Sequence, residues 1–164
     1  MKNHFLINTL SSFFYVGYIP GAPGTWASLV AVVIWVLLPV QSIVAQILIV
    51  SFAFLIGIYV AGLSEINSGV VDPSFVVIDE VAGMWLALLL MPRVPYPHYL
   101  TLALLSFIIF RFFDITKLYP INKLEQMSGG FGIMMDDVVA GVYAGIVSYL
   151  IISFLITILI STGL

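Results

Sequence analysis

An uncharged apolar run from Ile43 to Leu63 constrains this chain more than any other feature, because it is long enough to cross a bilayer as one helix. Shorter or interrupted apolar runs cover residues 27–38, 76–91, 99–113 and 138–160. Hydrophobic residues make up 62% of the 164 residues and charged residues only 8%. A water-soluble domain needs far more polar surface than this, so the sequence predicts an integral membrane protein.

The lipid bilayer around such a chain restricts its fold class. Lipid tolerates only a backbone whose hydrogen bonds are satisfied within the chain, so we expect an all-α fold. The runs predict a polytopic membrane helical bundle of four to five transmembrane helices with an N-terminal amphipathic segment, in a single domain over residues 1–164. The run over 27–38 is short for a span. No cleavage pattern follows the N-terminus, which we interpret as mature protein.

The charged residues exclude some functions. The net charge is −3 and no basic run is present, which argues against nucleic acid as a partner. Cysteine is absent, which excludes disulfides and thiolate chemistry. His4 and His98 stand alone, in a terminal segment and in a turn, and we assign neither a role.

Alternating crossings predict that the acidic residues share one side of the membrane. With five crossings, the loop near Pro20, the loops over 65–72 and 111–123, and the aspartates at 136–137 all face the same side. Four of the five cations would lie there and only Arg93 on the other side, so the positive-inside rule makes that side cytoplasmic. All eight acidic residues collect at this face, which predicts a functional site.

Two adjacent aspartates, Asp136 and Asp137, follow the stretch SGGFG at the start of the last apolar run. Carboxylate oxygens suit Mg²⁺, and the backbone N–H groups of Gly129 and Gly130 could approach a phosphate closely. The alternative is a helix N-cap, but one aspartate suffices for that, so the pair favours a metal site. We interpret the G-x-x-x-G spacing over 141–145 as a helix-packing surface.

Asp79 and Glu80 lie in the motif DPSFVVIDEVAG, near the start of an apolar run where ionisable groups are costly. The alternative is a pair that simply reaches water at the interface. Successive residues on a helix point about 100° apart, so at least one should point into the bundle toward a cation. Gly83, one turn further on, would leave room beside Asp79.

The stretch RFFDITK places Arg111, Asp114 and Lys117 three residues apart, on one helix face. An ordinary ladder of ion pairs is the alternative. Because an arginine fork suits a phosphate, we expect the two cations to bind one, whereas Asp114 is equally compatible with function and with the ladder.

The stretch PGAPGTWAS places Thr25 before a helix, with Ser28 one turn further on. Exposed N–H groups there would bind phosphate. Thr25 is also a good N-cap, so this motif alone is weak.

The motifs follow one another in the order APGTxxS, DPSxVVxDExxG, FRFFDIxK and GGxGIMxDDxxAGVYA, between about Pro20 and Ala144. In this order they resemble phosphatidylglycerophosphatase A, a family of bacterial membrane phosphatases. The resemblance implies Mg²⁺-dependent hydrolysis of phosphatidylglycerophosphate to phosphatidylglycerol and inorganic phosphate, at the cytoplasmic face of the inner membrane. This chain departs from the family in having Ser128 where a histidine is frequent and Leu118 where a proline is frequent.

The expected site combines the residues of all four motifs. Its metal ligands are expected to be Asp79, Glu80, Asp136 and Asp137, which match the acidic motif residues of the family, and Asp114 joins them as a catalytic residue. Its phosphate-binding residues are expected to be Arg111, Lys117, Thr25, Ser28, Gly129 and Gly130. The expected partners are the lipid substrate and the bilayer, and no obligate protein partner is inferred.

A small ion- or proton-coupled transporter is the alternative function, because intramembrane acids can form a relay. A transporter should carry polar residues near mid-span and repeated halves, whereas here the polar groups cluster at one end of the runs. The phosphatase is therefore the favoured prediction.

Overall fold

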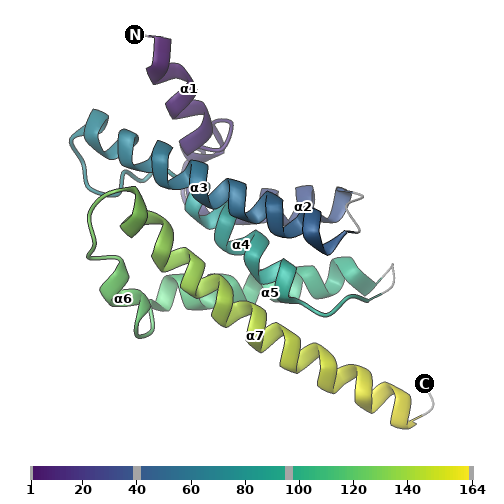
Figure 1. Cartoon of the computed structure of the whole chain (residues 1–164). Coiled ribbons are helices and arrows are strands. Elements are labelled where there is room, and N and C mark those ends of the chain that lie inside the picture. The colour runs from purple at the N-terminus through teal and green to yellow at the C-terminus, as the bar shows by residue number, and fades with distance from the viewer. Residues whose placement is uncertain (1, 39–41, 95–97, 163–164) are drawn as a thin grey trace.

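The computed structural model describes residues 2–38, 42–94 and 98–162. Within these residues the chain is all helical, with seven α-helices, one 3₁₀ turn and no strand, which confirms the predicted fold class (Figure 1). The elements are α1 Lys2–Ser11, η1 Val16–Tyr18, α2 Pro23–Leu37, α3 Ile43–Ser68, α4 Ile78–Leu90, α5 His98–Thr116, α6 Ile121–Leu124 and α7 Gly130–Thr162.

Three of the described helices are long and apolar enough to cross a membrane: α3, α5 and α7 over Gly130–Ile158. The chain is thus a membrane protein by length and composition. Helices α2 and α4 have 15 and 13 residues. At 1.5 Å per residue, each is shorter than the roughly 30 Å hydrocarbon core. The higher count of four to five spans stays a prediction.

The helices alternate in direction so that their polar ends meet. Helices α2, α4 and α7 start at one end of the bundle, and α3 and α5 run back toward it (Figure 1). The loops that join α3 to α4 and α5 to α7 therefore lie at the same end. Most of the acidic residues lie on these loops or on the helix turns beside them.

Two glycines let α4 and α7 approach each other more closely than side chains would allow. A Cβ atom on Gly83 of α4 would lie 2.5 Å from the carbonyl oxygen of Asp137, and one on Gly141 of α7 would lie 2.3 Å from the carbonyl oxygen of Gly83. A Cβ on Gly145 would meet the side chain of Leu90. The prediction that 141–145 is a packing surface is confirmed, and the room beside Gly83 is filled by the α7 backbone.

Two buried polar side chains of the apolar core find their hydrogen-bond partners on other helices. The indole Nε1 of Trp85 donates to the carbonyl oxygen of Ala31 at 3.0 Å, which joins α4 to α2. Ser148 of α7 donates to Ser106 of α5 at 3.1 Å. These bonds fix the helices that carry the polar end of the bundle.

Candidate active site

A cavity of about 200 Å³ lies at the end of the bundle where α2, α4 and α7 begin. Among the described residues, its lining includes six carboxylates and one ammonium group. The lining residues are Pro23, Asp72, Ser74, Val76, Asp79, Glu80, Asp114, Lys117, Asp136 and Asp137. The predicted convergence of the acidic motifs is therefore confirmed.

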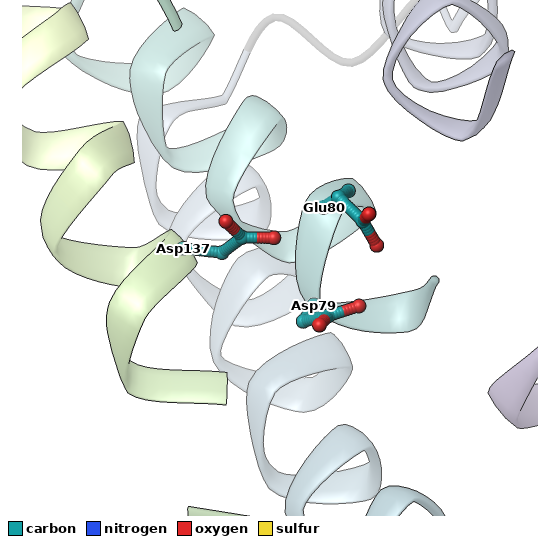
Figure 2. A group of neighbouring side chains, drawn as sticks. All are labelled: Asp79, Glu80 and Asp137. Carbon is teal, nitrogen blue, oxygen red and sulfur yellow. The ribbon is translucent and has the colours of Figure 1, made fainter. Parts of the chain in front are cut away.

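Three of these carboxylates form a group that we call the inner trio: Asp79, Glu80 and Asp137 (Figure 2). One oxygen from each can be chosen so that all three lie within 4.8 Å of one another. The first two come from the opening turn of α4, and Asp137 reaches toward them from α7. The close approach of the two helices at Gly83 brings these carboxylates together.

Two carboxylates of the inner trio each have a buried oxygen without a hydrogen-bond donor among the described residues. Asp79 is only 7% exposed, so the interpretation that both acids of its motif simply reach water is wrong. Oδ1 of Asp79 and Oε2 of Glu80 are buried and accept no hydrogen bond from the residues that the structure describes. A buried carboxyl group is protonated, paired with a cation or bound to a metal, and the inner trio is a group that could hold a metal ion.

The pair at 136–137 does not cap a helix. Helix α7 begins at Gly130, so both aspartates lie in its second turn and the N-cap alternative is wrong. Asp136 lines the cavity but accepts a hydrogen bond from Nζ of Lys117 at 2.7 Å. It is thus paired with a cation of the chain itself, beside the inner trio.

Lys117 stands immediately after α5, in a left-handed backbone conformation with φ 48°. Its ammonium group contacts two carboxylates, Asp136 at 2.7 Å and Glu125 at 3.2 Å. Burial alone would lower the pKa of Lys117, but the hydrogen bond to Asp136 and the charge of that carboxylate raise the pKa above its ordinary value. The ammonium group is therefore charged at neutral pH.

Arg111 pairs with Asp114, at 2.5 Å between Nη1 and Oδ2. The alternative of an ordinary ion pair along the helix thus applies to Arg111 and Asp114, whereas Lys117 pairs with Asp136 and Glu125. Asp114 lines the cavity and Arg111 stands behind it. Nε of Arg111 is buried without a hydrogen-bond partner among the described residues, so the guanidinium keeps an unused donor near the cavity.

The motif PGAPGTWAS contributes the start of α2 to the site. The helix begins at Pro23 after an N-cap at Ala22, so Thr25 is not the cap. Ser28 is buried and its hydroxyl donates to the carbonyl oxygen of Gly24 at 2.7 Å. Neither hydroxyl residue is among the described residues that line the cavity, and their phosphate role stays a prediction.

The glycine stretch before α7 attaches that helix to α3. The N–H of Gly129 donates to Oε2 of Glu65 at 2.9 Å. A Cβ on Gly130 would lie 1.8 Å from the carbonyl oxygen of Ile58. Neither glycine is among the described lining residues, so their phosphate role also stays a prediction. The observed role of Gly130 is close packing, and that of Gly129 is the hydrogen bond to Glu65.

Three acidic residues of the site were not singled out from the sequence. Asp72 lines the cavity, and its place at the head of the motif DPSFVVIDE was the signal for it. Glu65 and Glu125 contact site residues from loops and helix ends. No spacing rule indicates such contacts in advance.

Comparison with known proteins agrees with this arrangement. The model of the family described as phosphatidylglycerophosphatase A matches residues 9–152. The chain is 37% identical to phosphatidylglycerophosphatase A of Haemophilus influenzae over 147 residues, which cover 88% of each chain. It is 35% identical to phosphatidylglycerophosphatase A of Escherichia coli over 136 residues, which cover 82% of this chain and 77% of that protein.

A third relative has a different name. A protein of Bacteroides thetaiotaomicron, provisionally named phosphatidylinositol-3-phosphatase, is 40% identical over 146 residues, which cover 85% of this chain and 89% of that protein. No solved structure matches the chain. With its family match over most of its length and a carboxylate cavity built from the four motifs, the chain belongs to the phosphatidylglycerophosphatase A family.

Proposed function

We propose that this chain is a Mg²⁺-dependent lipid phosphatase that hydrolyses phosphatidylglycerophosphate to phosphatidylglycerol and inorganic phosphate. The observation that carries the proposal is the inner trio, whose buried oxygens lack donors, in the same cavity as the ammonium group of Lys117. The names of two relatives support the substrate. Family membership also favours a hydrolase over the transporter alternative.

The inner trio fits a hard divalent cation. All of its donors are oxygens, which Mg²⁺ prefers, and two of those oxygens are buried and unused. Asp79, Glu80 and Asp137 would hold the ion, whereas Asp136 would contribute through Lys117 or as a further ligand. A bound Mg²⁺ would offset the charge of the phosphate and make a water molecule more acidic.

The residues of the chain supply the remaining functions. Lys117 has three N–H donors and would bind a phosphate oxygen at the cavity. Arg111, held by Asp114, would add a charge-assisted donor from behind the lining. A phosphate monoester carries nearly two negative charges at neutral pH, so these cations are needed in a cavity with six carboxylates.

The proposed function is tested by phosphate release from phosphatidylglycerophosphate in mixed micelles by the purified full chain. We expect release with Mg²⁺, none with EDTA, and recovery when Mg²⁺ is added back. Phosphatidylinositol 3-phosphate serves as the competing substrate, because one relative is named for it. Release that persists unchanged in EDTA would exclude the metal-dependent mechanism, and a preference for the inositol lipid would exclude the proposed substrate.

We further propose that the cavity faces the cytoplasm at the bacterial inner membrane. The parity of the helices and the distribution of cations support this orientation. The chain has no cysteine, so single cysteines placed at Ser42 and Asn122, both exposed and at opposite ends of the bundle, can be labelled selectively. Only Ser42→Cys should react with an impermeant thiol reagent outside intact cells. Labelling of Asn122→Cys instead would reverse the orientation.

A further inference from the structure

A strained turn follows α1. Three successive non-glycine residues, Phe13, Phe14 and Tyr15, have left-handed backbones with φ of 45°, 55° and 69°. This backbone conformation is unfavourable for residues other than glycine, so the surrounding hydrogen bonds must hold the turn. The N–H of Phe14 donates to the carbonyl oxygen of Thr9 at 2.7 Å, and that of Tyr15 donates to Oγ of Ser12 at 3.1 Å.

The turn sends one aromatic ring inward and others outward. Phe13 is buried and packs edge-on against Trp85, with ring centroids 6.1 Å apart. We group the exposed residues between the turn and the first turn of α2 as the aromatic rim: Phe14, Tyr15, Tyr18, Ile19 and Trp26. No Asp, Glu, Lys or Arg occurs between Asn3 and Ser64, so the rim carries no formal charge.

The aromatic rim is continuous with the mouth of the carboxylate cavity. Tyr18 stacks on Phe75 with ring centroids 5.3 Å apart and planes 5° apart. Phe75 stands between Ser74 and Val76, which both line the cavity. A Cβ on Gly17 would lie 2.0 Å from the carbonyl oxygen of Phe75, so η1 lies directly against this segment.

A second connection leads from the other end of the rim. Pro23 lines the cavity and lies between Ile19 and Trp26 along the chain. The N–H of Val77 donates to the carbonyl oxygen of Ser11 at 2.9 Å, which fixes the end of α1 beside the start of α4. Two members of the rim are thus next to cavity-lining segments: Tyr18 through its stack on Phe75, and Trp26 through Pro23, one turn earlier in α2.

We propose that the aromatic rim binds the diacylglycerol part of the lipid whose phosphate enters the cavity. This inference rests on the proposed function and extends it to the recognition of the lipid. The carboxylates of the cavity can accommodate a cation-bound phosphate but not ester-linked acyl chains. Uncharged tyrosine and tryptophan rings suit the level of the lipid esters, where one edge is apolar and the other is hydrated.

Matched pairs of exposed aromatic residues provide the test. Phe14 is 67% exposed and Phe52 of α3, away from the cavity, is 66% exposed. Tyr18 and Tyr149 of α7 are each 51% exposed. Each residue is replaced by alanine in the full chain. Phosphate release is then measured from long-chain phosphatidylglycerophosphate in mixed micelles and from its deacylated, water-soluble counterpart.

We expect Phe14→Ala and Tyr18→Ala to raise KM for the long-chain lipid about three- to tenfold, a fraction of the effect of full aromatic burial. Their kcat/KM for the deacylated compound should equal that of the unmodified chain. In the control variants Phe52→Ala and Tyr149→Ala, both KM for the long-chain lipid and kcat/KM for the deacylated compound should be unchanged. Tyr18→Phe should restore the lipid KM, because it retains the ring on Phe75.

Other results would overturn the proposal. An equal loss with both substrates would mean that the rim only supports the cavity. An equal loss in rim and control variants would mean general contact with lipid, and no loss in Phe14→Ala and Tyr18→Ala would mean no role in binding. Should the unmodified chain hydrolyse neither compound, the proposed function fails, and the rim is judged by labelling with phosphatidylglycerol that carries a photoreactive group near the acyl ester. Labelling should map to residues 13–26, and its absence there would overturn the proposal independently.

Discussion

The inner trio and its neighbours Asp114 and Asp136 line the same cavity, yet they differ in what neutralises them. The two neighbours each contact a cation of the chain, at 2.5 Å for Asp114 and 2.7 Å for Asp136. In the trio, Oδ1 of Asp79 and Oε2 of Glu80 have no donor among the described residues. The two neighbours are therefore paired within the chain, whereas the trio keeps two buried oxygens that could accept a bond from a metal ion or a proton.

This difference separates two residues that are adjacent in sequence. Successive helix positions point about 100° apart, so Asp137 is directed toward α4 while Asp136 reaches Lys117. Adjacent aspartates need not share one ligand. The comparison predicts that their variants fail in different ways.

The largest effects should come from the inner trio. Asp79→Asn and Asp137→Asn nearly conserve size but remove ligand charge, and we expect phosphate release to fall about a thousandfold, as for loss of a principal electrostatic group. Calorimetric titration with Mg²⁺ should show weakened binding, which is a readout independent of turnover. Near-normal Mg²⁺ binding in both variants would show that the trio is not the metal site.

Asp136→Asn should have a smaller effect of a different kind. This substitution loosens Lys117 but leaves the trio intact. We expect kcat/KM for phosphate release to fall about ten- to a hundredfold, as is typical when a residue that orients another functional group is removed. The loss should lie mainly in KM, with little change in the Mg²⁺ titration. If Mg²⁺ binding weakens as much as in Asp137→Asn, the metal has four protein ligands, as the sequence predicted.

Much of the site could be predicted because membrane burial makes charge informative. Burying an acid in an apolar run is costly, so an acid such as Asp79 in that position indicates a function. The alternating direction of the helices then places the acidic motifs at one end of the bundle. The sequence could not assign Asp136 to Lys117, because that contact depends on the left-handed turn after α5. It also could not show that Gly130 serves packing, since a glycine beside a helix start fits a phosphate equally well.

The spacing of the inner trio can be disturbed without changing a charge. In Gly83→Ala, the new Cβ would lie 2.5 Å from the carbonyl oxygen of Asp137. We expect a loss of about 1 to 2 kcal/mol in stability from overpacking, with weaker Mg²⁺ binding because α4 and α7 separate. Gly62→Ala is the control, since its Cβ would lie 3.1 Å from its nearest neighbour, the nitrogen of Gly130. Thermal unfolding in detergent checks both, and equal destabilisation would mean that the crossing at Gly83 has no special role.

The smallest effect should come from the outermost carboxylate, Glu125, whose side chain is 48% exposed and lies 3.2 Å from Nζ of Lys117. If Lys117 binds phosphate as proposed, Glu125 would compete for its ammonium group, and Glu125→Gln should then lower KM and the inhibition constant for inorganic phosphate. An exposed ion pair contributes about 0.2–1 kcal/mol, so the change should be at most about fivefold.

Gln126→Lys shifts the net charge equally but keeps the ion pair, and it should change these values less. If both variants shift KM and the inhibition constant equally, the effect comes from the net charge near the cavity and Glu125 does not compete with phosphate. If Glu125→Gln instead raises KM, then Glu125 holds Lys117 in position, as Asp136 does.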